Sequence, residues 1–239
     1  MELLLSPEAW IAFATLTALE LVLGIDNVIF ISILVDKLPS EQREKARKLG
    51  LFMAMFMRVG LLLALAWIVG LVAPLFTVLG HEVSGRDLIL MLGGLFLLWK
   101  STTEIHHTLE GADDGPATTA KASFASVIMQ IMVIDLVFSL DSIITAVGMV
   151  DEVAVMIAAV IASVALMMAF AKHIGEFVSA HPSIKMLALS FLVVVGVVLV
   201  AEGFEHHIPK GYVYFAMAFS VGVEMLNIRY RKKAARREG

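Results

Sequence analysis

The chain has 239 residues, of which 59% are hydrophobic and 17% are charged, and its mean hydropathy is +0.89. This composition excludes an ordinary soluble domain and indicates a polytopic membrane protein. The absence of cysteine excludes disulfides and thiolate metal sites. The net charge of −4 excludes little, because the placement of charge matters more than its sum in a membrane protein.

Seven apolar stretches follow one another along the chain, at or near the length that a membrane-spanning helix needs. We therefore expect an all-α polytopic membrane protein with seven transmembrane helices, at about 10–35, 49–72, 88–103, 124–150, 153–171, 184–201 and 212–228. The first stretch is not a signal peptide, since no basic residue precedes it and its apolar run is too long. The helices form a single transmembrane domain, residues 1–229, and a basic cytoplasmic tail follows at 230–239.

Lysine and arginine residues alternate between successive loops. The loop after the first span and the C-terminal tail are rich in them, and two flank each of the loops after the third and fifth spans. The loops on the other side hold only Arg86 and Lys210. Because basic residues are retained in the cytoplasm, we expect the N-terminus outside and the C-terminus in the cytoplasm.

Two acidic motifs lie within the apolar stretches, ELVLGIDN at 20–27 and DLVFSLDS at 135–142. In each motif two acids are six residues apart and a small polar residue follows the second acid. The first motif enters the membrane from outside and the second from inside. The sequence therefore predicts an inverted repeat of spans 1–3 (residues 1–110) and spans 4–6 (121–208), with a seventh helix at 209–229 appended. Inverted repeats with a polar site near the midplane recur among secondary transporters.

The four repeated acids indicate an ion site. An uncompensated carboxylate in hydrocarbon is costly, so buried acids persist where they face water, a partner charge or a cation. Carboxylate, amide and hydroxyl oxygens are hard donors that suit Mg²⁺, Ca²⁺ and Mn²⁺. Burial also raises carboxyl pKa values, so the same acids could carry protons when the metal leaves. The predicted metal ligands are Glu20, Asp26, Asn27, Asp135 and Asp141.

The six-residue spacing leaves two geometries open. On a continuous helix it corresponds to about 600° of rotation and about 9 Å of rise, so the two acids would point about 120° apart. Either the helices are interrupted near Gly24 and Ser139, which would fold each pair of acids together, or the acids serve two neighbouring ion positions. Gly24 favours an interruption in the first motif, because glycine weakens a helix.

Several further polar residues are weaker candidates. Arg58 is the one basic residue near the middle of a span, and one of the four acids could be its structural partner rather than a ligand. The polar loop near Glu104 could gather metal or could simply be solvated. The predicted secondary residues are Ser142, Gln130, Arg58, Lys100, Glu104 and Glu224.

The two motifs, together with KSTTEIHHTLEG at 100–111 and HIPKGYVYFAMAFSVGVEMLN at 207–227, resemble the TerC family, and among its members the short, YgdQ-like inner-membrane group. The similarity runs over essentially the whole chain. It implies seven transmembrane helices, membership of the LysE-type transporter superfamily and manganese efflux as the activity. Carried over by motif, it implies that the four acids and Asn27 bind the metal.

We therefore expect a divalent-cation transporter that exports Mn²⁺ across the inner (plasma) membrane, with proton coupling as an option. The alternative is a membrane interaction protein that assists the metalation or assembly of metal-dependent proteins. Flux in proteoliposomes discriminates the two, because only a transporter moves metal alone. No Gly-x-Ser-x-Gly or His-Glu-x-x-His motif indicates an enzyme. The expected partners are the lipid bilayer and a divalent cation, without nucleic acid, and a homo-oligomer is compatible with the sequence.

Overall fold

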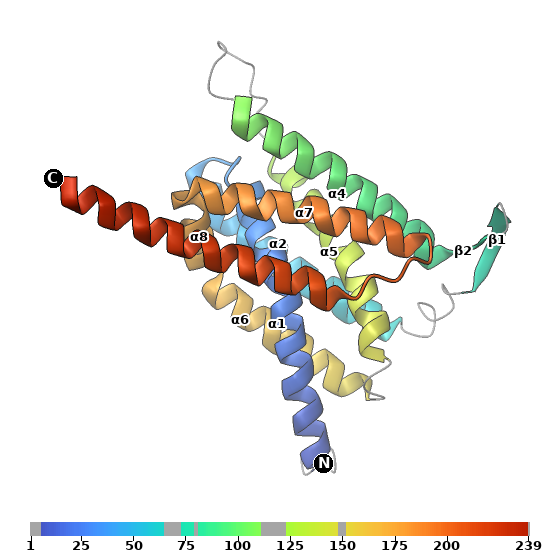
Figure 1. The fold of residues 1–239 in the computed structure, drawn as a ribbon. Coiled ribbons are helices and arrows are strands. Elements are labelled where there is room, and N and C mark those ends of the chain that lie inside the picture. The colour runs from blue at the N-terminus through green and yellow to red at the C-terminus, as the bar shows by residue number, and fades with distance from the viewer. Residues whose placement is uncertain (1–5, 65–72, 79–80, 111–122, 148–151, 239) are drawn as a thin grey trace.

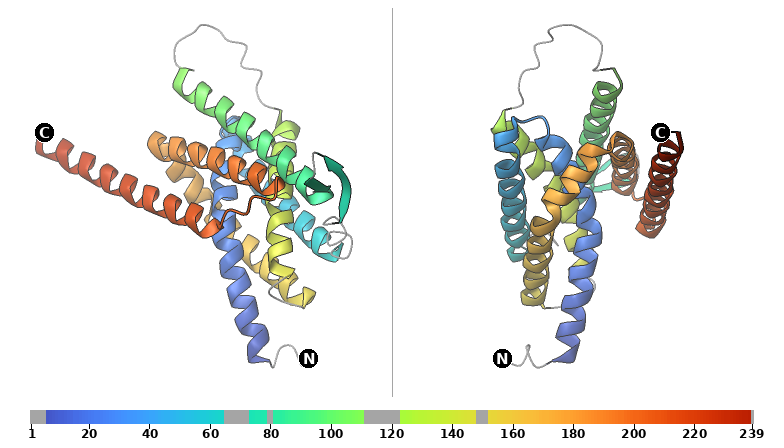
Figure 2. Two further views of the ribbon diagram at one scale, coloured as in Figure 1. Left: turned by 45° about the vertical axis from the view of Figure 1, so that its right-hand side comes forward. Right: turned by 90° about the vertical axis from the view of Figure 1, so that its left-hand side faces the viewer.

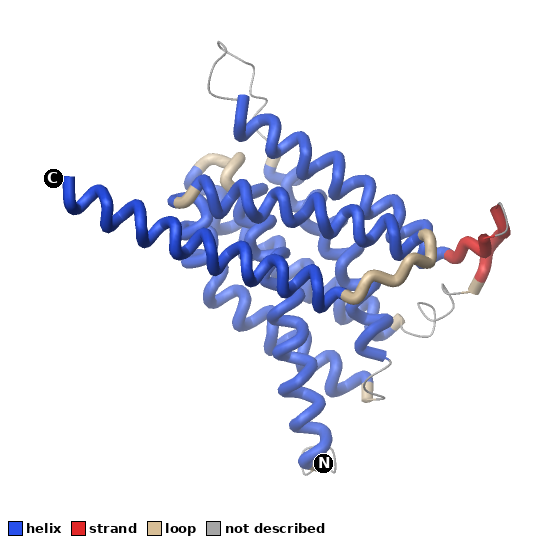
Figure 3. The backbone as a smooth tube through the Cα atoms, viewed as in Figure 1, coloured by secondary structure: helices blue, strands red, loops and turns tan. Residues whose placement is uncertain are grey.

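The computed structural model describes residues 6–64, 73–78, 81–110, 123–147 and 152–238. Helices dominate these residues, and a short antiparallel hairpin of β1 (Pro74–Val78) and β2 (His81–Ser84) stands at one edge (Figure 1; Figure 3). The described helices are α1 (Pro7–Val35), α2 (Ser40–Leu63), α4 (Gly85–Glu110), α5 (Phe124–Val147), α6 (Val153–Ala180), α7 (Pro182–Gly203) and α8 (Lys210–Glu238).

Among the described residues, four helices are long and apolar enough to cross a membrane, namely α4, α6, α7 and α8. α1 makes a fifth if its two halves, Pro7–Val22 and Asn27–Val35, count as one span. The all-helical membrane architecture is therefore confirmed. The apolar part of α5, Phe124–Leu140, is shorter, and the expected end of the second span, 65–72, lies outside the described residues, so the count of seven spans stays a prediction.

Local sequence signals place the helix starts. Ser6 caps α1 by accepting a hydrogen bond from the backbone N–H of Ala9 at 3.3 Å, and proline follows at the first helical position, where its missing N–H costs nothing. Before α4, the Ser84 N–H and hydroxyl donate to Asp87 Oδ2 at 2.9 and 2.6 Å, and the Asp87 N–H donates to Ser84 Oγ at 3.2 Å. This reciprocal cap satisfies backbone donors that would otherwise be left unpaired.

The helices pack in pairs. α4 lies along α7, α1 lies along α6, and α2 contacts α5 and α6 (Figure 1; Figure 2). α4 and α7 approach closely at two glycines, because a Cβ built on Gly94 would lie 2.6 Å from the Gly196 carbonyl oxygen. Small residues at such crossings allow helix backbones to meet, as expected where lipid supplies no hydrophobic drive for association. α8 contacts α7, and its C-terminal part extends away from the other helices.

Polar contacts join the ends of four helices at one end of the bundle, which we call the charged end. At the end of α1, Asp36 accepts a hydrogen bond from Ser179 of α6 at 2.5 Å and lies 3.5 Å from Arg43 of α2. The next residue, Lys37, forms an ion pair with Glu104 near the end of α4. The basic loop after α1 and the C-terminal ends of α4 and α6 therefore lie together, as the alternation of charge predicts.

Several helices extend beyond the predicted spans, among them α4, which continues to Glu110. α2 begins at Ser40 rather than near 49, since its polar first turns contain good helix formers and a Glu44–Lys48 ion pair of 2.7 Å. α6 continues to Ala180 and α8 to Glu238, so much of the predicted basic tail is helical. The sequence did not predict the hairpin before α4, where Phe76, Thr77, Val78 and Val83 supply the aromatic and β-branched residues that strands favour.

Gly94→Ala should lower the free energy of unfolding by about 1–3 kcal/mol, because the added methyl group meets backbone atoms of α7 that cannot rotate away. Gly60→Ala in α2 is the matched control, since a Cβ there meets nothing within 4 Å in the described structure. Reversible denaturation of the purified protein in detergent measures both. Equal stability of the two variants would show that α4 and α7 do not meet at Gly94.

Candidate functional site

A buried arginine joins the two motifs. Arg58 of α2 reaches between α1 and α5, where its Nη1 donates to Glu20 Oε2 at 2.5 Å and its Nη2 donates to Asp135 Oδ1 at 2.5 Å. Its Nε lies 3.1 and 3.2 Å from the two Asp135 carboxylate oxygens. The three residues are only 4–5% exposed. The sequence suggested one acid as the partner of Arg58, whereas the structure gives it two, which we call the acid pair.

The members of the acid pair differ in their other partners. Asp135 also accepts hydrogen bonds from Asn27 Nδ2 at 3.4 Å and from Ser139 Oγ at 3.2 Å. The Ser142 hydroxyl donates to the Ser139 carbonyl oxygen at 3.1 Å and lies near Glu20. Ser139 was not among the predicted site residues, although its position one helical turn after Asp135 is a signal that could have identified it.

These contacts cross between the motifs. Glu20 and Asp135 occupy equivalent positions in the two motifs, as do Asn27 and Ser142. Asn27 of the first motif contacts the acid of the second, and Ser142 of the second lies near the acid of the first. The helices are also paired crosswise. α1, which carries the first motif, packs on α6, and α5, which carries the second motif, packs on α2. Each motif therefore completes the surroundings of the acid in the other.

The charges at the acid pair do not balance. With both carboxylates ionised, two negative charges share one guanidinium, which leaves one negative charge in excess inside apolar helices. Asn27 Oδ1 is buried and accepts no hydrogen bond from the described residues. The possible metal ligands around Arg58 are all oxygen atoms, and such hard ligands suit a small divalent cation. No group of three or more His, Asp or Glu side chains with metal-binding geometry occurs within the described part of the chain.

The second acids of the motifs are not placed by this geometry. Asp26 and Asp141 belong to α1 and α5, but their side chains lie outside the described residues. The backbone around them differs between the motifs. α1 remains helical from Pro7 to Val35, but its halves Pro7–Val22 and Asn27–Val35 are bent by 40°, so Gly24 lies at a bend and not at an interruption of the helix. α5 runs as one helix through Ser139 and Leu140, so of the two geometries the interruption near Ser139 is wrong. A serine that bonds within its own helix does not break it.

A small cavity of about 10 Å³ adjoins the acid pair on one side, at the lower limit of the room that one water molecule needs. Glu20 is the polar residue in its lining, and the others are Leu16, Leu62, Ile143, Met156, Ala159 and Val160. Leu16 precedes Glu20 along α1 and Leu62 follows Arg58 along α2, so the cavity lies on the side of Glu20 away from the charged end. Of the acid pair, only Glu20 lines it.

Comparison with known proteins identifies the family. Residues 5–238 match the family described as the integral membrane protein TerC family. The chain belongs to the TerC family.

Three relatives are similar over all or nearly all of this chain. The UPF0053 inner membrane protein YgdQ of Escherichia coli strain K12 is 56% identical over 227 residues, 95% of each chain. A UPF0053 protein of Haemophilus influenzae is 56% identical over 97% of this chain and 98% of its own. The UPF0053 inner membrane protein YoaE of E. coli is 51% identical over this whole chain, which covers 46% of YoaE. No solved structure matches the chain.

These relatives and the membrane-length helices make this TerC protein a multi-pass inner membrane protein.

The remaining predicted site residues of this protein make other contacts. Gln130 Nε2 donates within α5 to Ser126, at 3.2 Å to the carbonyl oxygen and 3.1 Å to Oγ. Lys100 lies 2.9 Å from Glu104, which also pairs with Lys37 at the charged end. Glu224 accepts a hydrogen bond from Asn227 within α8 at 3.3 Å and lies near Ser183 of α7. None of these contacts reaches the acid pair.

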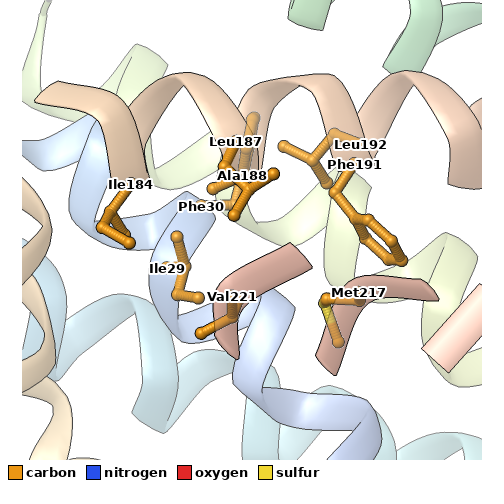
Figure 4. A pocket seen from close by; sticks show the side chains of 9 residues that line it. All are labelled: Ile29, Phe30, Ile184, Leu187, Ala188, Phe191, Leu192, Met217 and Val221. Carbon is orange, nitrogen blue, oxygen red and sulfur yellow. The ribbon is translucent and has the colours of Figure 1, made fainter. Parts of the chain in front are cut away.

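A second pocket of the TerC protein lies between α1, α7 and α8 (Figure 4). All nine side chains that line it are apolar, among them Phe30, Phe191 and Met217. Without a polar donor or acceptor side chain it offers no ligand to a cation. The acid pair is therefore the stronger candidate for ion binding in the described part of the chain.

Asp135→Asn should lower the free energy of unfolding by about 3–5 kcal/mol, the cost of removing one partner from a buried ion pair. Glu20→Gln should cost less, because Arg58 keeps its three short contacts to Asp135 and the excess negative charge disappears. Denaturation of both variants in detergent, without added metal, measures the difference. A larger loss for Glu20→Gln would contradict the assignment of Asp135 as the main partner of Arg58.

Proposed function

We propose that this TerC protein transports a divalent cation, Mn²⁺ first, out of the cytoplasm across the inner membrane through the acid pair and the neighbouring acids Asp26 and Asp141. The observation that carries the proposal is that two buried acids, Glu20 and Asp135, bond to the same guanidinium of Arg58. One carboxylate is enough to neutralise a buried guanidinium. The extra carboxylate is costly unless a cation visits it.

The ligand atoms favour a hard divalent ion as the substrate. Carboxylate oxygens of Glu20 and Asp135 and the free amide oxygen of Asn27 lie together, and sulfur ligands are absent from the sequence apart from methionine. Mn²⁺, Mg²⁺ and Ca²⁺ prefer such oxygen ligands. Manganese is placed first because of the family resemblance described above, and the other two ions are the competitors to test.

Alternating access through an inverted repeat is the proposed mechanism. The crossed contacts of Asn27 with Asp135 and of Ser142 with Glu20 support a two-fold relation between spans 1–3 and 4–6. The joining of basic helix ends at the charged end supports its assignment to the cytoplasm. With that orientation the cavity beside Glu20 lies on the outer side of the acid pair. Protons are the proposed exchange ion, since the same carboxylates can take them up when the metal leaves.

Asp26→Asn and Asp141→Asn should each abolish Mn²⁺ flux while the protein still inserts and folds. The amide keeps the shape and one oxygen ligand but removes a charge that offsets the divalent ion, a loss of about 1–3 kcal/mol or more in binding. Flux per folded protein in proteoliposomes, with and without a pH gradient, is the measurement.

Glu176→Gln is the control, because Glu176 is exposed on α6 and its side chain is 62% accessible. It should retain wild-type flux. If both aspartate variants also transport Mn²⁺ at the wild-type rate, the repeated acids are structural and the transporter proposal falls.

A further inference from the structure

Arg58 holds the oxygen atoms that a metal would need. Its Nη1 donates a hydrogen bond to Glu20 Oε2, and its Nη2 and Nε donate to the two carboxylate oxygens of Asp135. We propose that Arg58 is a built-in substitute cation, which fills the acid pair between transport events and must be displaced by the incoming ion. This inference rests on the proposed function and assigns Arg58 a role in selecting the ion.

The contacts make simultaneous occupation unfavourable. A small divalent ion binds carboxylate oxygens at about 2.0–2.6 Å, whereas the guanidinium stands between the two acids and donates to three of their four oxygens. An ion that bridges the acids would also bring its two positive charges against the guanidinium in a poorly solvated site. Arg58 and the ion are therefore competitors for the same carboxylates.

The order of exchange follows from the unequal partners of the acids. Glu20 faces the cavity and is held by one short bond from Arg58. Asp135 is held by two nitrogens of Arg58 and by Asn27 and Ser139. The Nη1–Glu20 contact is the weaker end of the bridge and opens first. The Arg58 side chain then keeps its bond to Asp135 until the ion reaches the second acid.

Competition with a fixed charge of +1 selects for divalent ions. A monovalent ion that replaces Arg58 at the acid pair exchanges one positive charge for another and leaves the same excess negative charge. A divalent ion removes that excess and so gains more from the exchange. Na⁺ and K⁺ therefore do not displace Arg58 from the acid pair. Arg58 selects the ion in this way without contributing any ligand atom to the metal.

A permanent structural bridge is the competing interpretation, and Arg58→Gln separates the two. If Arg58 competes with the ion, its removal should tighten Mn²⁺ binding at least about fivefold, the lower end of coupling between linked binding events. It should also let Na⁺ inhibit Mn²⁺ binding. In the absence of metal the variant should melt at a lower temperature than the wild type, and Mn²⁺ should raise its melting temperature by more. Isothermal calorimetry and thermal unfolding of the full chain in detergent measure these quantities.

Arg47→Gln is the matched control. Arg47 is a second buried arginine of α2, 8% exposed, and it lies against Gly175 of α6 rather than the acid pair. It should leave the dissociation constant for Mn²⁺ and the response to Na⁺ unchanged. Should Arg58→Gln not fold, Arg58→Lys gives the same test, because a compact ammonium cannot bond both acids as the guanidinium does. The dissociation constant of the Arg58→Lys variant for Mn²⁺ should also fall.

The outcomes are distinguishable. If the wild type binds no divalent cation, the proposed function fails. If the wild type binds Mn²⁺ but the Arg58 variants bind it equally or more weakly, the proposed function stands and the substitute-cation role is overturned.

Discussion

The buried bridge from Arg58 to Glu20 and Asp135 ties three helices together at the centre of the protein. α1, α2 and α5 each contribute one member. In an environment with little water, a guanidinium and two carboxylates can remain ionised only where their geometry and hydrogen bonds are good. The positions of these helices are therefore constrained by electrostatics as well as by packing. Any movement that opens α1 relative to α5 must also change the partners of Arg58.

The surrounding fold holds the two acids of this bridge unequally. Asn27 and Ser139 hold Asp135 firmly, whereas Glu20 borders a small cavity. The bend in α1 lies within the first motif, next to Gly24, where a Cβ would meet Met167 of α6. One acid is thus held in an uninterrupted helix, and the other belongs to a bent helix beside a small cavity. This asymmetry gives a direction to the proposed exchange of arginine for metal.

Much of this arrangement could be predicted from the sequence. The apolar runs gave the membrane helices, and the equal spacing of Glu20–Asp26 and Asp135–Asp141 picked out the two helices of the site. The parts of the site that depend on contacts between distant residues could not be predicted. Arg58 is separated from Asp135 by 77 residues, so nothing local says that it bonds two acids. Helix ends were misjudged at Ser40, Ala180 and Glu238 because charged segments continue helices beyond the bilayer. The hairpin before α4 is too short to give a periodic signal.

The most direct test of this account is a crystal structure with Mn²⁺, in which anomalous scattering at the manganese edge locates the ion. If the ion displaces Arg58, the anomalous peak lies between α1 and α5 with oxygen ligands from Glu20, Asp135 and Asn27, and the Arg58 side chain is turned away from Glu20. An ordered manganese elsewhere in the molecule, with Arg58 still bonded to both acids, would contradict it.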